Sequence, residues 1–329
     1  MTMFRHHCTK TTIILLFTFC VHADAQTPPL QVTPPTVSTA GTNHSIWYIS
    51  TRHLPLNPEE NTNGGELYYY RLTNNQWQPS TFKDYSADTR PTCLIVHGSP
   101  ASTELVANAS LEVYEHLASQ IKREQSVRFV IWSWPAHRRV TGLVNEFKDQ
   151  VIRAEQQSRY LAQFIDATRN QSPTAVVGYS MGGRVMLGAL ELLAGGKPPH
   201  QTKYNPSSIR EQPFKVMLLV SAVGHSSLQK GALYSSALTQ ADECLVIYNN
   251  KDPLLKRYRK LFDSKREDRQ DAIGHIGAQN PTEIAATGVQ YLQLDVTASI
   301  GNHHDIRAYT RNKTVLRQII EHSLMSIID

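Results

Sequence analysis

A serine at the centre of a Gly-x-Ser-x-Gly sequence, residues 178–182, is the residue of this chain best suited to nucleophilic chemistry. An apolar run at residues 174–177 precedes it, and apolar positions at helical spacing follow as far as residue 193. A strand that runs through this motif into a helix is typical of a nucleophile elbow, whose tight turn needs small residues on either side of the serine. Gly178 and Gly182 supply them. The alternative is an ordinary β–α turn with a serine facing solvent.

A nucleophilic serine needs a base that takes its proton and an acid that orients the base. Asp252 is the candidate acid, because it comes just after a strand predicted at residues 243–248. Asp-Pro also begins many plain turns, so the position of Asp252 at a strand end carries the argument. Asp242 and Asp295 are alternatives, but Asp242 precedes a predicted strand and Asp295 lies inside one.

The candidate base is one of two adjacent histidines, His303 and His304, in the loop after the last predicted strand. The unperturbed pKa of histidine lies near neutrality, which suits this role. The chain has 14 histidines, so a surface role for this pair is the alternative. His322 is the other histidine after the last strand, and it falls in the predicted C-terminal helix. We favour His303 over His304 and keep both as candidates.

An acyl-transfer site also needs two backbone N–H groups directed at the developing oxyanion. One is expected from Met181, the residue after the serine. The other is expected from the loop that starts at His97-Gly98, after the predicted strand at residues 92–96. Because Pro100 has no N–H, Ser99 is the better donor in this loop. The alternative for His97-Gly98 is a simple strand-to-helix turn.

Alternating strands and helices must position these residues. Helices are predicted around residues 101–120, 146–168, 184–193 and 315–324, and strands at residues 45–50, 66–72, 92–96, 127–132, 174–177, 214–221, 243–248 and 289–296. This alternation predicts one α/β domain with a mostly parallel sheet of about eight strands and helices on both faces. The first two strands have no helix between them, which predicts an antiparallel start.

Composition limits the classes of function. The 329 residues include 33 Lys and Arg and 28 Asp and Glu, a formal net charge of +5. The basic runs at residues 138–139 and 256–260 are interpreted as solvated faces, because no nucleic-acid motif accompanies them. The chain has no Cys-x-x-Cys, no metal-spaced His/Cys cluster and no Gly-rich phosphate loop, so we expect neither a metal nor an organic cofactor.

The first 25 residues are predicted to be a secretory signal peptide. Basic residues precede an apolar run at residues 13–21, and Ala23-Asp24-Ala25 fits a cleavage site. Cys20 suggests a lipoprotein alternative, which the bulky Phe19 disfavours. Residues 26–43 are Pro/Thr-rich and read as an extended lead-in, and residues 44–329 form the domain. The signal peptide predicts an exported protein, periplasmic or extracellular. No later stretch is long and apolar enough to cross a bilayer.

Two of the four cysteines, Cys8 and Cys20, leave with the predicted signal peptide. Cys93 and Cys244 both begin apolar strands, and they are either buried free thiols or a disulfide.

Taken together, the chain resembles the α/β-hydrolase superfamily from about residue 45 to its end. The motifs that carry the resemblance are a strand followed by His97-Gly98, a strand followed by Ser133-Trp134-Pro135, the elbow at Ser180, a strand followed by residues 250–252, and the late histidine pair. It is most similar to a poorly characterised group of bacterial α/β-hydrolases, which carry Ser-Trp-Pro after the fourth strand and then a polar, alanine-containing helix. In this chain that helix starts near residue 147.

The resemblance implies an eight-stranded sheet and a Ser-Asp-His hydrolase, but no substrate. The loop after Gly98 lacks the triple glycine of many lipases, and the segment between the elbow helix and Asp252 is too short for a large cap, so a small or partly open acyl pocket is expected. Residues 195–212 and the tryptophans Trp132 and Trp134 are candidate specificity elements, with Trp132 equally suited to the core.

The predicted function is therefore an exported serine esterase with a small-molecule ester substrate. The alternatives are an inactive α/β-hydrolase scaffold that binds a ligand or partner, and an acyltransferase. The oligomeric state stays open.

Overall fold

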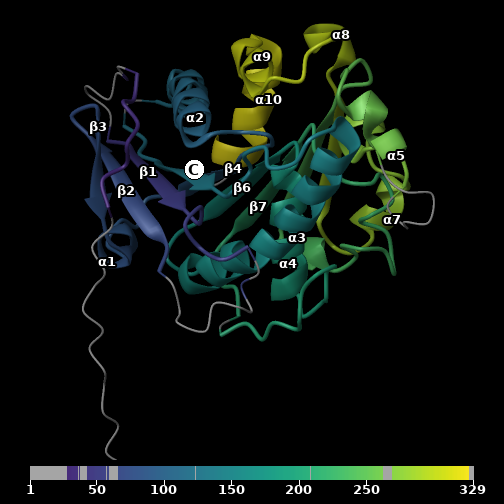
Figure 1. Ribbon diagram of the computed structural model, residues 1–329, viewed down its shortest axis with the longest axis horizontal. Coiled ribbons are helices and arrows are strands. Elements are labelled where there is room, and N and C mark those ends of the chain that lie inside the picture. Colours follow the sequence, from purple (N-terminus) through teal and green to yellow (C-terminus); the bar gives the residue numbers. More distant parts are fainter. Residues whose placement is uncertain are drawn as a thin grey trace, which may run out of the picture.

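The computed structural model describes residues 28–35, 37, 43–56, 58, 66–122, 124–207, 209–261 and 269–325. The predicted signal peptide, residues 1–25, and part of the predicted lead-in lie outside these residues. One nine-stranded sheet in the order β3-β2-β1-β5-β4-β6-β7-β8-β9 forms the centre of the molecule (Figure 1). The strands are β1 Ser45–Ser50, β2 Tyr68–Thr73, β3 Gln76–Ser80, β4 Thr92–Val96, β5 Arg128–Ser133, β6 Thr174–Tyr179, β7 Phe214–Leu219, β8 Glu243–Tyr248 and β9 Gln290–Asp295.

The sheet is antiparallel at one end and parallel in the rest. β1 pairs antiparallel with β2, and β2 with β3, which confirms the predicted antiparallel start. From β1 to β9 every neighbouring pair is parallel. Every residue of β1, β4 and β5 is buried, as expected of parallel strands that are covered on both faces.

The ninth strand is β3, which the sequence-based prediction of about eight strands missed. Its residues are mostly polar and include Pro79, so it lacks the apolar pattern of a core strand. A proline is tolerated here because β3 is an edge strand, where a missing N–H removes no ladder hydrogen bond on the open side. A tight turn at Asn74 and Asn75, with φ of 51° and 56°, joins it to β2.

The long helices fall into two groups. α2 (Thr103–Ala118) connects β4 to β5 in one direction along the sheet, whereas α3 (Leu143–Thr168) and α4 (Gly182–Leu193) connect strands in the other direction. Because parallel crossovers are right-handed, α2 lies on the face opposite α3 and α4. α3 packs against α4, and α2 packs against α9 (Ile306–Arg311) and α10 (Lys313–Ile320) (Figure 1). Helices therefore cover both faces, as predicted.

The remaining helices are short. They are α1 Phe82–Ser86, η2 Ala237–Gln240, η3 Leu255–Arg257, α5 Tyr258–Leu261, α6 Ile273–Ile276, α7 Pro281–Ala285, α8 Thr297–Ile300 and the π-helix η4 Glu321–Met325. Four of them lie between β8 and β9, in a connection where the sequence pattern predicted no helix. None of the helices that the structure describes has the length and apolar content needed to cross a membrane.

Both cysteines of the domain are buried free thiols. Cys93 lies on β4 and Cys244 on β8, and β6 and β7 separate these strands. Three strand spacings amount to about 14 Å, twice the reach of a disulfide between Cα atoms. Of the two readings left open by the sequence, the structure therefore shows the free thiols.

Candidate active site

Ser180 lies on a tight turn between β6 and α4. Its φ is 52°, a left-handed conformation that L-residues rarely adopt. A Cβ on Gly178 would lie 2.6 Å from the Gly183 Cα, and a Cβ on Gly182 would lie 2.1 Å from the Val96 carbonyl oxygen. Only glycine fits at either position, which is the physical reason for the Gly-x-Ser-x-Gly pattern. The turn directs Ser180 to the carboxyl edge of the parallel strands.

Ser180, His304 and Asp252 form a chain of hydrogen bonds. His304 Nδ1 lies 2.5 Å from Asp252 Oδ2, and His304 Nε2 lies 2.9 Å from Ser180 Oγ. An ionised carboxylate only accepts, so Nδ1 carries the proton, and Nε2 accepts from the Ser180 hydroxyl. Asp252 is fully buried, Ser180 is 5% exposed, and the His304 side chain is 12% exposed. This arrangement can deprotonate a serine hydroxyl as it attacks.

The second oxygen of Asp252 is also occupied. Asp252 Oδ1 accepts hydrogen bonds from the backbone N–H groups of Leu254 and Leu255, at 2.9 and 3.0 Å. These bonds fix the carboxylate plane and satisfy an acid that has no access to solvent. The two alternative acids lie elsewhere: Asp242 pairs with Arg210, and Asp295 accepts from the Thr297 N–H.

The sequence-based preference for His303 disagrees with this geometry. The His303 side chain is exposed, and His304 makes the contacts to Ser180 and Asp252. His303 contributes its backbone, whose carbonyl oxygen accepts from Asn249 Nδ2 at 3.2 Å and from the Tyr309 hydroxyl at 3.0 Å. Two neighbouring residues of one loop point in different directions, and the residue pattern carries no signal that separates them.

The loop after β4 packs directly against the serine. A Cβ on Gly98 would lie 2.9 Å from the Ser180 Cβ, and the next residue, Ser99, lines the same pocket as His304. Met181 follows Ser180 and caps the N-terminus of α4. Within the described residues, the N–H groups of Met181 and Ser99 donate no hydrogen bond. Met181 thus adjoins the serine in sequence, Ser99 adjoins Gly98, which packs on the serine, and neither N–H is used by another group among the described residues.

Residues of the Ser-Trp-Pro segment hold this loop in place. The Trp134 indole N–H donates to the His97 carbonyl oxygen at 2.9 Å, and the Trp134 backbone N–H donates to His97 Nε2 at 3.3 Å. His97 Nδ1–H in turn donates to the Gly98 carbonyl oxygen at 2.6 Å. Burial, with a smaller effect of the Arg52 charge, lowers the pKa of His97 to about 3. His97 is therefore a neutral structural residue and not a second base.

A pocket of about 290 Å³ opens beside His304 and Ser99. α2 contributes Leu105, Val106 and Ala109 to it, and the Asp252 loop contributes Leu254. Leu105 and Leu254 are about half exposed, at 50% and 51%, so the pocket has an apolar rim. The charged groups in its wall, Asp305 and Arg307, form an ion pair with each other. The pocket thus presents a mainly apolar surface next to Ser180.

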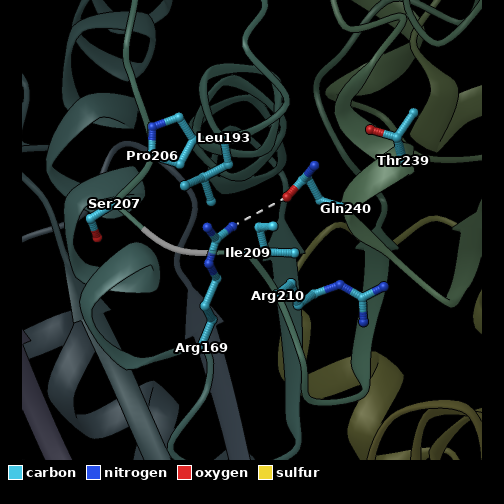
Figure 2. A pocket seen from close by; sticks show the side chains of 8 residues that line it. All are labelled: Arg169, Leu193, Pro206, Ser207, Ile209, Arg210, Thr239 and Gln240. Carbon is cyan, nitrogen blue, oxygen red and sulfur yellow. Dashed lines mark hydrogen bonds between the residues drawn. The ribbon is translucent and has the colours of Figure 1, made fainter.

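A different hollow, of about 510 Å³, lies at the opposite edge of the sheet (Figure 2). Arg169, Arg210 and Gln240 lie a few residues before the starts of β6, β7 and β8 and contribute to it. Other lining residues are Leu193, Pro206, Ser207 and Ile209. Part of the 195–212 segment is therefore far from Ser180, which disagrees with its suggested role in specificity. Trp132 is fully buried and packs on Phe164, so it belongs to the core.

Sequence reasoning missed three contributors to the site. Asn249 and Tyr179 anchor the histidine loop, the latter by donating its hydroxyl to the His304 carbonyl oxygen at 2.8 Å. Arg52 binds the Ser133 hydroxyl with Nε at 2.7 Å and the Ala101 carbonyl oxygen with Nη2 at 3.1 Å. Among the described residues, no group of three or more His, Cys, Asp or Glu side chains is arranged to hold a metal ion.

No family model and no curated protein sequence matches this chain. Among solved structures, it is similar to an inhibited esterase B from Lactobacillus rhamnosis at 15% identity and a TM-score of 0.34, over 84% of this chain and 89% of that one. An esterase rPPE mutant matches at 11% identity and a TM-score of 0.38, over 80% of each chain. An acetylxylan esterase matches at 15% identity and a TM-score of 0.33, over 70% of this chain and 97% of that one. Likenesses this weak assign no activity.

Proposed function

We propose that this protein is a serine hydrolase of the α/β-hydrolase type that cleaves carboxylic esters. The observation that carries the proposal is the hydrogen-bonded chain from Ser180 through His304 to a fully buried Asp252. The strained φ of Ser180 and the two open N–H groups beside it fit the same role. An ordinary turn with a structural serine would not require these features to occur together.

In the proposed reaction, Ser180 Oγ attacks the ester carbonyl carbon while His304 Nε2 takes the hydroxyl proton. The N–H groups of Met181 and Ser99 bind the oxyanion of the tetrahedral intermediate. The C–O bond to the alcohol breaks, and the imidazolium of His304 protonates the leaving oxygen. A water molecule then attacks the acyl-enzyme by the same route, which releases the acid and returns the proton to Ser180.

The apolar pocket beside His304 and Ser99 supports an acyl group of short to medium length as the substrate's carbon chain. Apolar side chains from α2 and from Leu254 would bury such a chain, which is favourable by about 25 cal/mol per Å² of apolar surface. A chain too long for the pocket would leave its far end in water.

We also propose that the protein is exported to the periplasm or beyond the cell. The support is the sequence pattern of residues 1–25, with basic residues, an apolar run and a cleavage site in order. N-terminal sequencing of the protein from the exported fraction tests it, and a mature chain that starts at Met1 would contradict it.

The first test of the activity is labelling by a fluorophosphonate probe, which an activated serine attacks with loss of fluoride. We expect the wild type to be labelled and Ser180→Ala to be unlabelled, with hydrolysis of short-chain esters lost in parallel. A well-folded wild type that resists the probe and leaves such esters intact would favour a ligand-binding scaffold instead.

The adjacent histidines provide a matched pair of variants. His304→Ala is expected to lower kcat for a short-chain ester by roughly a thousandfold or more, because Ser180 loses its general base. His303→Ala is expected to keep kcat, since only its backbone contacts the site. If His303→Ala lowered kcat and His304→Ala kept it, His303 would be the base.

A further inference from the structure

A second open hollow, of about 600 Å³, lies against the loop that carries Asp252. Four of the side chains that line it are cations, and two more are carboxamides: Lys251, Lys256, Arg257, Lys260, Asn250 and Asn302. No carboxylate lines it among the described residues. The hollow therefore concentrates positive charge next to the proposed active site.

Carboxylates within the described residues do not neutralise these cations. Lys251, Lys256, Arg257 and Lys260 are all exposed, and within the described part of the chain none of them forms an ion pair. In contrast, the buried arginines at positions 153, 169 and 184 each have a carboxylate partner. Like charges four residues apart, such as Lys256 and Lys260, repel each other, and a bound anion would remove this repulsion.

Hydrogen bonds tie the segment that carries the cations to the proposed acid. The Asp252 carbonyl oxygen accepts from the Lys256 N–H at 3.1 Å, and the Asp252 carboxylate caps the N–H groups of residues 254 and 255. Two residues on, Tyr258 is buried, and its hydroxyl accepts from Arg184 Nη2 at 2.6 Å. Asp252 thus holds the backbone at Lys256, and Lys260 lies two residues after the anchored Tyr258.

Two short strips of chain each line the hollow at one residue and the apolar pocket at a neighbouring residue. In the first strip, Pro253 lines the hollow and Leu254 lines the pocket. In the second, Asn302 lines the hollow and His304 lines the pocket. Each strip is only two or three residues long, so one molecule can occupy the hollow and the pocket at once, with its reacting ester near His304.

We propose that the hollow binds an anionic group, of the phosphate or carboxylate class, carried by the ester substrate on the side away from its apolar acyl chain. The inference rests on the proposed ester hydrolysis and specifies its substrate class, an amphiphilic ester with an anionic head. Four cations that form no ion pair within the described residues attract such a head, and the apolar pocket takes the chain.

The test compares two esters that differ in charge, para-butyryloxyphenyl phosphate and its uncharged dimethyl ester. At low ionic strength, we expect the wild type to hydrolyse the anionic ester with a kcat/KM about tenfold higher, and added salt to reduce this advantage. The double variant K256Q/K260Q should reduce the advantage about fivefold. K197Q/K203Q, which removes equal charge outside the hollow, should preserve it.

Equal kcat/KM for the two esters in the wild type would overturn the proposal, and so would an advantage that K256Q/K260Q leaves intact. A measurement with inorganic phosphate alone distinguishes the anionic head of a substrate from a free anion as the ligand of the hollow. A rise in Tm with phosphate that K256Q/K260Q abolishes, without preference for the anionic ester, would make a free anion the ligand and refute the substrate assignment. Failure of fluorophosphonate labelling and of both hydrolyses would instead refute the hydrolase function, and the phosphate measurement would then decide separately whether the hollow binds anions.

Discussion

At the scale of single residues, Asn249 determines where the proposed base lies. It is fully buried at the end of β8, and its Nδ2 donates to the carbonyl oxygens of Gly301 and His303 at 2.8 and 3.2 Å. The Tyr309 hydroxyl, 3.1 Å from the same amide nitrogen, donates to His303 as well. One side chain therefore joins the strand that precedes Asp252 to the loop that carries His304, which makes Asn249 a positioning residue.

We predict that Asn249→Ala lowers kcat by about tenfold to a hundredfold with little change in KM, because a displaced base impairs the attack more than it impairs binding. Steady-state kinetics with a short-chain ester, together with the rate of fluorophosphonate labelling, measures this effect. Tyr309→Phe, which leaves both hydrogen bonds from Asn249 to the loop carbonyls in place, should give a smaller decrease. Loss of kcat in strict proportion to loss of folded protein would show that Asn249 has a structural role only.

His97 links the active-site loop to the pH dependence of stability. Its native pKa, lowered to about 3 by burial, lies well below the value near 6.5 in an unfolded chain. Between these two values the unfolded state binds a proton that the native state does not, so stability rises with pH across this window. The contribution is complete above about pH 6.5 and is lost as the pH falls toward 3.

We predict that the free energy of unfolding falls by up to about 1.4 kcal/mol per pH unit, from this group alone, as the pH is lowered from 6.5. His97→Asn retains a short polar side chain and removes the titrating group. The difference in free energy of unfolding between wild type and variant should therefore shrink steadily as the pH is lowered. Urea unfolding at several pH values measures it. A difference that is independent of pH would show that the pKa of His97 is the same in the native and unfolded states.

At the scale of elements, the strongly apolar segments were predictable and the polar ones were not. β4, β6 and β7 are nearly continuous apolar runs because helices cover both of their faces, and their positions agree with the prediction. β3 is polar because it lies at the sheet edge, where only one neighbour constrains it. The short helices η3 and α5 have no clear period, because contacts to Asp252 and Arg184 hold them instead.

In the proposed site too, residues fixed by local constraints were predictable and residues fixed by long-range contacts were not. Ser180 was predictable because a local turn restricts its neighbours to glycine, and Asp252 because it directly follows a strand. The choice between His303 and His304 depends on hydrogen bonds from Asn249, which lies more than 50 residues earlier in the chain. Contacts over that sequence distance leave no pattern in a single sequence.

At the scale of the whole molecule, the carboxyl and amino edges of the sheet, where the parallel strands end and begin, carry different groups. The carboxyl edge carries Ser180, Asp252, His304, the apolar pocket and the cationic hollow. The amino edge carries the hollow of Figure 2, where Arg169 and Arg210 are paired with Asp166 and Asp242. This division agrees with the rule that open α/β sheets bind ligands outside the carboxyl ends of their strands. Of the cations at these two hollows, the arginines of the amino edge have carboxylate partners, and the cations of the carboxyl edge form no ion pair within the described residues.

The sheet order also predicts the redox behaviour of the molecule. Cys93 and Cys244 lie about 14 Å apart across three strand spacings, so the fold is expected to be independent of any disulfide even in an oxidising compartment. Burial raises the pKa of the Cys93 thiol to about 12 and that of Cys244 still further, which keeps both thiols protonated and unreactive.

For the chain of residues 26–329, purified without reductant, we predict that a thiol reagent such as Ellman's reagent labels neither cysteine in the native state and labels both after unfolding in urea. Dithiothreitol should leave Tm unchanged, because it has no bond to reduce. Cys93→Ala is the matched control, and it should halve the labelling of the unfolded chain. Unfolded protein that shows no free thiol until reductant is added would mean that the two cysteines are joined, which would require β4 and β8 to lie closer than the parallel order β4-β6-β7-β8 allows.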